Sequence, residues 1–412
     1  MKKVLYKILK LTVLGLLVGL IIAGYQFIGH EVISLSKYLL NSKNIIWIST
    51  IACSVLLLVG LMVLNKKYPG YYGSGVPQIE AYHRGIYEIN PYKNLIFITI
   101  NSLFAFFGGF LLGSEGPSVT IGSSIGMIGN KAFKDEEKSE VALFGSAGFA
   151  CAFSSPLAGL CHLIEENKHL LSWKFILKGI YVIALAFIIS YLVYPHSLLP
   201  QFEFDFLPFK FYLILILVVG LCIVVSKLYM YLIIKVKDLT KGKQIMFYLT
   251  PVLLVLFMLL RRYFPILSGN GLDSLKVDVL TFSLLAILGI FSFRLIFTSI
   301  SVSSNISGGL VLPTLAIGSL VAILAVKAFG HLIPELNEYV GLFIICGMLV
   351  VLAIVTNAPL TAFVLGLKCA PFKVVALPLF ICLTIGMVPF YVFKWSNIYH
   401  QLEKRIPGIK HE

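Results

Sequence analysis

The chain has 412 residues, of which 58% are hydrophobic and 13% charged, and its mean hydropathy of +0.94 excludes a soluble globular domain. Its apolar runs are solid, whereas the strands of an outer-membrane barrel alternate apolar and polar residues, so membrane-spanning helices are expected. The formal net charge of +14 comes from Lys and Arg residues largely between or beyond these runs, which indicates membrane topology and not nucleic-acid binding.

The first part of the chain predicts two membrane spans. Residues 1–10 are basic, and the positive-inside tendency places them in the cytoplasm. The apolar run at 11–29 is too long for a signal peptide and lacks a small-residue cleavage site, so we interpret it as a retained span. A polar stretch follows, and a second span is expected at about 45–64.

A glycine-rich break comes next, in YPGYYGSGVPQIEAYHRG at 68–85. Its glycines prevent a regular helix through residues 70–77, whereas a helix can begin after Pro77. Ser74 would place a hydroxyl group at this break.

The segment GSEGPSVTIG at 113–122 is a second break between apolar runs. Gly113 and Gly116 leave the backbone free to turn, and Pro117 suits the first turn of a helix, where N–H groups lack partners. These N–H groups and the positive end of the helix dipole would attract an anion in front of Glu115. Because irregular backbone within a membrane lines a cavity or is buried in protein, a glutamate there predicts a functional role.

The rest of the chain alternates between apolar spans and short broken segments. After a charged loop at 131–139, a short helix should start near Pro156 and end in the carboxylates Glu165 and Glu166. The basic C-terminal tail favours a cytoplasmic terminus, as at the N-terminus, and we expect no soluble regulatory domain after the last span. Spans are expected at 175–194, 209–234, 247–260, 279–300 and up to about 392, and broken segments at 304–322 and 356–369.

An internal repeat connects the two halves. Three residue pairs share one offset of 196 (309 − 113, 313 − 117, 318 − 122): Gly113 and Gly309, Pro117 and Pro313, and Gly122 and Gly318. The pair Pro156-Leu157 recurs as Pro359-Leu360, with an offset of 203 (359 − 156). We therefore expect one all-α membrane domain of two inverted repeats, about 30–194 and 209–405, with the site where paired broken helices meet.

The motifs at these breaks are similar to those of one family. The sequence from about residue 11 to 405 resembles the CLC family of chloride channels and proton-coupled anion exchangers. The motifs that carry the resemblance are GSGVP at 73–77, GSEGP at 113–117, SPLAGLCHLIEE at 155–166, GGLVLP at 308–313, NAPLTAFVLGLKC at 357–369 and Tyr399 in SNIYHQL.

The resemblance implies a homodimer in which each subunit has its own pore, and it implies exchange of chloride for protons. The hydroxyls of Ser74 and Tyr399 would bind a central anion. Glu115 would be the gating glutamate, which competes with anions and carries protons, and Glu166 the inner proton-transfer glutamate. The backbone around the anion path would come from Gly113, Ser114, Gly116, Leu310 and Val311.

Three positions depart from the family pattern. Ser114 stands where many members have a basic residue, Val311 where many have Phe, and Lys368 where chloride exchangers often have an acidic residue. The fluoride-exporting branch tends to replace the serine of the first motif and to lack the inner glutamate, so Ser74 and Glu166 favour chloride. Val311 keeps fluoride open as an alternative.

Two other functional classes were weighed. A passive anion channel of the same fold would leave Glu166 unused. A membrane enzyme acting on lipid is disfavoured because the chain has no HExxH cluster, and its one GxSxG match, GSSIG at 122–126, falls inside the helix expected after Pro117 and not at a strand-to-helix turn. We therefore expect no enzymatic activity and no cofactor. The seven cysteines are scattered singly without a CxxC pair, so neither disulfides nor a metal site are expected.

Several residues also have a plain structural explanation. Ser74 could satisfy a turn, Glu166 could end a helix in water, and Tyr399 is one of 20 tyrosines, which often line membrane interfaces. Glu165 is expected to be a surface or structural carboxylate, and His162 a packing histidine. Together, the sequence features favour a multi-pass cell-membrane protein with both termini in the cytoplasm. Its expected partners are chloride or a similar small anion, protons and the lipid bilayer.

Overall fold

The computed structural model describes residues 2–68, 70–71, 73–134, 137–241 and 243–406. All regular elements in these ranges are helical, and nine of the helices described there are long and apolar enough to cross a membrane. The predicted all-α membrane fold is therefore confirmed. The last part of the basic tail, residues 407–412, lies outside the described residues.

Sixteen α-helices follow one another along the described chain, joined by short 3-10 turns. In the first half they are α1 (Lys2–Leu40), α2 (Asn44–Lys67), α3 (Val76–His83), α4 (Pro91–Gly108), α5 (Glu115–Ala132), α6 (Val141–Ala152), α7 (Pro156–Glu166) and α8 (Trp173–Val193). In the second half they are α9 (Tyr212–Thr240), α10 (Ile245–Tyr263), α11 (Leu284–Ser303), α12 (Val311–Gly330), α13 (Val340–Thr356), α14 (Pro359–Leu367), α15 (Phe372–Val392) and α16 (Ile398–Glu403).

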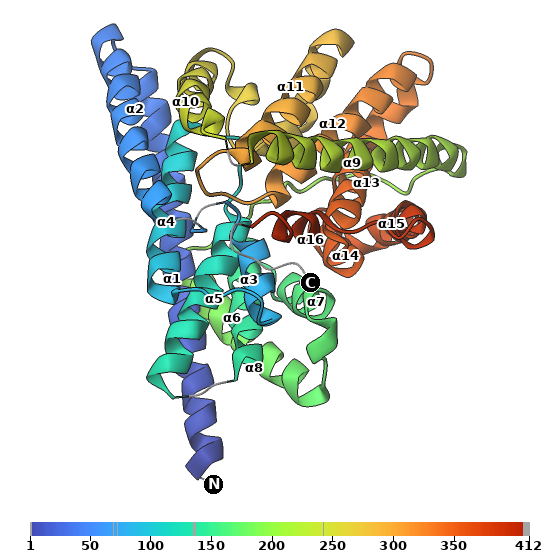
Figure 1. Cartoon of the computed structure of the whole chain (residues 1–412). Coiled ribbons are helices and arrows are strands. Elements are labelled where there is room, and N and C mark those ends of the chain that lie inside the picture. Colours follow the sequence, from blue (N-terminus) through green and yellow to red (C-terminus); the bar gives the residue numbers. More distant parts are fainter. Residues whose placement is uncertain (1, 69, 72, 135–136, 242, 407–412) are drawn as a thin grey trace.

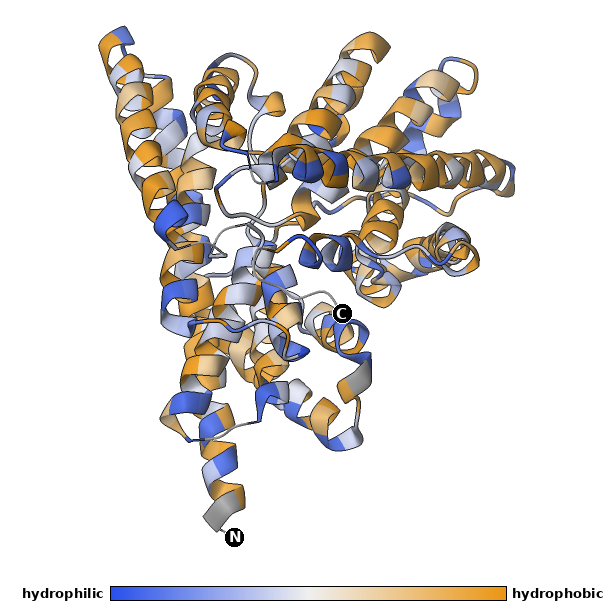
Figure 2. Ribbon diagram, viewed as in Figure 1, coloured by the Kyte–Doolittle hydropathy of each residue, from blue (hydrophilic) through white to orange (hydrophobic). Residues whose placement is uncertain are grey.

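Among the described helices that are long enough to cross a membrane, α12 and α13 are the most buried, and they pack against each other. In the span 334–356, which includes α13, 94% of the most apolar window is buried, against 17% for α2. Figure 1 shows α1 and α2 along one edge of the molecule, with α9 crossing near α13. In Figure 2 hydrophobic residues predominate on these peripheral helices, as expected for surfaces that face lipid.

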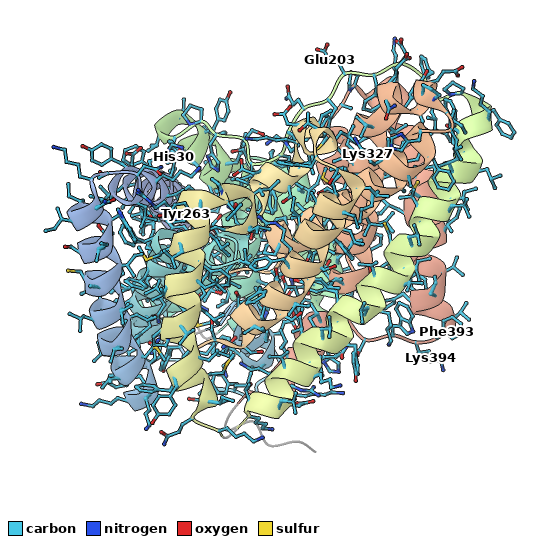
Figure 3. All side chains as sticks on the ribbon, turned by 90° about the horizontal axis from the view of Figure 1, so that it is seen from above. His30, Glu203, Tyr263, Lys327, Phe393 and Lys394 are labelled. Carbon is cyan, nitrogen blue, oxygen red and sulfur yellow. The ribbon has the colours of Figure 1, made fainter. Side chains whose placement is uncertain are left out.

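The two repeats predicted from the sequence are visible as corresponding helices. Glu115 begins α5 and Val311 begins α12, again with an offset of 196 (311 − 115). In Figure 3, Glu203 in the loop after α8 lies near one edge, whereas Phe393 and Lys394, which follow α15, lie toward the opposite side.

Several predicted boundaries were wrong. The span expected to end at 234 continues as α9 to Thr240, and α3 begins at Val76, before Pro77. The first span was expected to end at about residue 29, but α1 continues as one helix of 39 residues to Leu40. His30 and Glu31 are exposed, so these polar side chains reach solvent without interrupting the helix. The span expected from 279 begins only at Leu284, because Ser283 caps α11 by accepting a hydrogen bond from the backbone N–H of Ala286, 3.2 Å away.

A buried ionic cluster connects α1, α8 and the start of α6. The carboxylate of Glu140 is fully buried, and it pairs with the Nζ atoms of Lys10 at 2.9 Å and Lys178 at 2.6 Å. Lys10 is only 1% exposed. The charged loop predicted at 131–139 therefore leads into a structural ion cluster.

Candidate functional site

Three glycine-rich loops meet at the centre of the molecule. Gly113 and Gly309 exchange two backbone hydrogen bonds, of 2.8 Å and 2.6 Å. Gly73 donates a hydrogen bond to the carbonyl of Ile306 at 3.2 Å and accepts one from Gly308 at 3.1 Å. The breaks predicted at 70–77, 113–116 and 308–313 are therefore neighbours, and both repeats contribute to one site.

Two of these glycines lie against the carboxylate of Glu115, and one of them, Gly309, also lies against backbone. A Cβ atom on Gly113 would lie 2.2 Å from Oε2 of Glu115, and a Cβ atom on Gly309 would lie 2.7 Å from the same oxygen. The Cβ of Gly309 would also lie 2.7 Å from the backbone nitrogen of Gly116. The carboxylate thus lies between a glycine of each repeat.

Glu115 is the first residue of α5 and is fully buried. Neither of its carboxylate oxygens makes a hydrogen bond of good geometry to a described residue, although the backbone N–H groups of Glu115 itself and of Leu312 lie close enough to interact with the carboxylate. A buried carboxylate is expensive to keep ionised without partners, so such a group takes up a proton or moves toward donors or water. The geometry therefore suits a side chain that changes its position and its protonation state.

Ser74 faces a cavity of about 200 Å³ that it shares with basic residues. Its Oγ atom is buried and has no hydrogen-bond partner among the described residues. The cationic side chains that line the same cavity are Lys237, Lys241, Lys243 and Arg405. Positive charge around a cleft raises the local concentration of anions, so this cavity can deliver an anion to Ser74.

Tyr399, Glu115 and Glu166 line a second and much smaller cavity, of about 20 Å³. Gly116 and Val311 also contribute to its wall. The phenol of Tyr399 is nearly buried, and no hydrogen bond joins its hydroxyl to another described residue. Tyr399 and Ser74 thus line different cavities. Helix α16 reaches both, because its Leu402 lines the cavity of about 200 Å³ that Ser74 faces.

A third cavity, of about 320 Å³, continues from Glu166 between α3, α6 and α7. Glu166 and His162 line both this cavity and the small one beside Glu115. The two predicted proton-transfer glutamates are therefore connected through adjoining spaces. The remaining predicted positions, Ser114 and Leu310, are the N-caps of α5 and α12.

Glu165 has a different role from its neighbour Glu166. Its carboxylate accepts hydrogen bonds from the backbone N–H groups of Leu360 at 2.6 Å and Thr361 at 2.9 Å, and from the Thr361 hydroxyl at 2.6 Å. These N–H groups belong to the first turn of α14, where intrahelical acceptors are lacking. Glu165 is thus a structural cap across the two repeats.

Lys368 is a residue whose role the sequence did not reveal. Its Nζ atom donates hydrogen bonds to the carbonyls of Phe153 at 2.6 Å and Ser154 at 2.9 Å, just after α6. A cation suits the negative end of a helix dipole. The only signal in the sequence was the reversed charge itself, since nothing in the spacing indicates that the end of α14 approaches the end of α6.

The described residues contain no group of three or more His, Cys, Asp or Glu side chains able to hold a metal ion. The seven cysteines are unpaired, and five of them are buried. The polar groups that line the three cavities are hydroxyls, carboxylates, side-chain amides, the imidazoles of His83 and His162, and lysine and arginine side chains.

Comparisons with known proteins agree with this architecture. Residues 56–388 match the family model described as voltage gated chloride channel. The H(+)/Cl(-) exchange transporter ClcA of Vibrio vulnificus strain YJ016 is 27% identical over 421 residues, covering 96% of this chain and 88% of the relative. ClcA of Vibrio parahaemolyticus is 26% identical over 379 residues, covering 87% of this chain and 80% of the relative.

Solved structures show the same fold. A slow cyanobacterial Cl-/H+ antiporter superposes with a TM-score of 0.83 at 25% identity, covering 97% of both chains. A CLC-type fluoride/proton antiporter superposes with a TM-score of 0.75 at 16% identity, covering 98% of both chains, which supports the fold alone.

Proposed function

Because the chain belongs to the voltage gated chloride channel family, we propose that it is an antiporter that exchanges chloride for protons across a membrane. The observation that carries the proposal is Glu115, a buried carboxylate without a hydrogen bond of good geometry to a described residue, enclosed by glycines of both repeats. The curated relatives with chloride/proton exchange in their names support the same activity.

The anion path would run from the basic cavity past Ser74 to the N-termini of α5 and α12. An anion beside the unpartnered Ser74 hydroxyl is held by dipoles and one hydroxyl without a full positive charge, so it can bind and still leave. Tyr399 would donate from the other side, and the backbone near Gly116 and Val311 would complete the path. Glu115 would occupy the same path when ionised and leave it when protonated.

The proton path would enter through the large cavity and pass Glu166. That cavity has room for water and is lined by polar side chains, so it can hydrate Glu166. Protonation of Glu115 would then favour the anion-filled state, and this linkage couples the two fluxes.

The test is proton movement driven by a chloride gradient in liposomes that contain the purified protein. We expect uphill proton uptake in the wild type, and its loss in Glu115→Gln and Glu166→Gln. Glu338→Gln, an exposed glutamate, is the matched control and should behave as the wild type. Chloride flux without proton movement would contradict antiport and indicate a passive channel of the same fold.

The identity of the anion needs its own comparison. The unpartnered Ser74 hydroxyl and the presence of Glu166 favour chloride. A fluoride gradient should therefore drive protons more weakly than an equal chloride gradient. Proton coupling seen only with fluoride would make the chain a fluoride/proton antiporter.

Assembly and orientation are expected from the family resemblance. A homodimer with one pore in each subunit should have twice the chain mass of 45.6 kDa in detergent, after correction for bound detergent. Both termini are expected in the cytoplasm, so tags at either end should resist protease in intact cells. A monomeric mass, or cleavage of either tag from outside, would contradict these two expectations.

A further inference from the structure

His162 lies between the two proton-transfer glutamates of the proposed function. It precedes Glu166 by four residues in α7, which puts both side chains on one face of the helix, one turn apart. His162 lines the small cavity beside Glu115 as well as the large cavity that reaches Glu166. An imidazole is thus present at the junction of the two spaces.

The two ring nitrogens of His162 have different surroundings. Nδ1 lies 3.1 Å from the hydroxyl of Ser146, and the ring stacks on Phe149 with centroids 4.4 Å apart. No described residue hydrogen-bonds to Nε2, although the ring lines both cavities. A ring that is fixed on one side and open on the other is suited to bind a proton at Nε2.

The volume beside Glu115 is too small for a chain of waters. A cavity of about 20 Å³ has room for about one water molecule. Three hydroxyls line its wall. Thr356 donates to the carbonyl of Leu352 and Thr361 donates to Glu165, and the hydroxyl of Tyr399 is the one that the proposed function assigns to the anion. A proton that leaves Glu166 therefore needs a further group that can accept and release it.

Charged groups of both signs line the two cavities that His162 faces. Carboxylates face its cavities from α3, α5 and α7, namely Glu80, Glu115, Glu165 and Glu166. The basic groups facing them are Arg84, Lys168 and the imidazole of His83, and Tyr399 adds a phenol from α16. Attraction from four carboxylates opposes repulsion from two permanent cations, so a positive ring is not isolated there.

We propose that His162 carries protons between Glu166 and Glu115, which rests on the proposed antiport. With its hydrogen on Nδ1 directed at Ser146, the neutral ring accepts a proton at Nε2 from Glu166, directly or through a water. The imidazolium then releases the proton from Nε2 through the water of the small cavity to the carboxylate of Glu115. His162 is neutral before and after the transfer, and the proton charge moves from Glu166 to Glu115.

The test is His162→Phe in the full-length protein in liposomes, with chloride efflux and proton uptake measured on the same sample. Phenylalanine preserves stacking on Phe149 and removes the titratable nitrogen. We expect proton uptake to fall at least about tenfold while chloride efflux stays within about twofold. Cys161→Ala, next to His162 but outside both cavity walls, is the control.

The outcomes separate this proposal from antiport itself. Absence of proton uptake in the wild type would contradict the antiport, whereas normal wild-type uptake with an unchanged His162→Phe variant would overturn only the relay. Equal loss of chloride and proton flux in His162→Phe would show a packing role and would also overturn it. If that variant cannot be purified, Ser146→Ala decides: slower proton uptake with unchanged chloride flux supports the relay, and unchanged proton uptake refutes it.

Discussion

The ammonium group of Lys368 donates a hydrogen bond of 2.6 Å to the carbonyl oxygen of Phe153. The two residues belong to different repeats, and the contact holds the end of α14 against the end of α6. A second bond to Ser154 satisfies another carbonyl at the same place. The positive charge that differs from the family pattern therefore has a structural explanation in this chain.

Replacing this lysine should weaken the packing of the two repeats. Lys368→Met removes both donors and leaves carbonyls at the end of α6 without their cation, which should lower the free energy of unfolding by about 1.5–3 kcal/mol. Thermal unfolding in detergent measures the effect. Lys373→Met, an exposed lysine at the start of α15, is the control and should unfold as the wild type does. Identical unfolding of both variants would contradict the capping role.

The glycine next to Glu115 in space should not tolerate a methyl group. Gly309→Ala places a Cβ 2.7 Å from both Glu115 Oε2 and the backbone nitrogen of Gly116, and backbone cannot move aside cheaply. We expect a loss of about 1–3 kcal/mol of stability and displacement of the Glu115 carboxylate, seen as altered chloride flux. Gly289→Ala in α11 is the control, because nothing lies within 4 Å of its Cβ position. Equal chloride flux in the two variants would contradict the prediction that Gly309 encloses the Glu115 carboxylate.

The adjacent glutamates of α7 should separate stability from transport. Glu165→Gln weakens the cap on the first turn of α14, so unfolding should become easier by about 1–3 kcal/mol while proton coupling is kept. Glu166→Gln should give the opposite result, with near-normal stability and no proton uptake. Unfolding and gradient-driven proton flux, both measured on each of the two variants, test this prediction. If Glu165→Gln alone abolished coupling, the assignment of the two carboxylates would have to be exchanged.

The Glu140 cluster predicts a loss of stability in acid. Burial raises the pKa of Glu140, but hydrogen bonds from Lys178 and Lys10 outweigh it, so its pKa lies below the ordinary carboxyl value of 4.5. A lowered pKa in the folded state stabilises the protein above that ordinary value, and this contribution disappears as the pH falls further.

Glu140→Gln should therefore be less stable at neutral pH, by up to about 3 kcal/mol, and less sensitive to acid. Unfolding followed from pH 7 down to about pH 2 in both proteins tests this difference. Glu338→Gln, which changes an exposed carboxyl group, should keep the acid sensitivity of the wild type. Parallel curves for Glu140→Gln and the wild type would rule out this source of acid sensitivity.

The sequence was informative where backbone conformation is determined locally. Glycines around Glu115 and the proline at 117 predicted the break and the start of α5, and the offset of 196 predicted that Gly309 would have a corresponding place. The membrane-spanning helices could also be predicted, because their hydropathy is a property of the local sequence. The end of α1 was misplaced because polar residues at its surface reach solvent and do not stop a helix.

Contacts between distant segments were not predictable in this way. Glu165 caps α14 across 195 or 196 residues, and Lys368 caps α6 across 214 or 215, and neither distance corresponds to any local pattern. The position of His162 at the junction of two cavities depends on the walls contributed by α3, α5 and α6. From the sequence alone, a single histidine in an apolar helix is therefore interpreted as a packing residue, because the cavities beside it are visible only in the structure.

The hydrogen bonds between Gly113 and Gly309 also set an order of events during synthesis. When the ribosome has completed the first repeat, the partner of Gly113 has not yet been made, and the glycine that encloses Glu115 from the other side is still absent. Until residue 309 has been made, Gly113 lacks the partner with which it exchanges two backbone hydrogen bonds. Completion of the site is thus a late step, and a truncated chain that ends before residue 309 would contain every residue of the GSEGP motif without the enclosure that the motif requires.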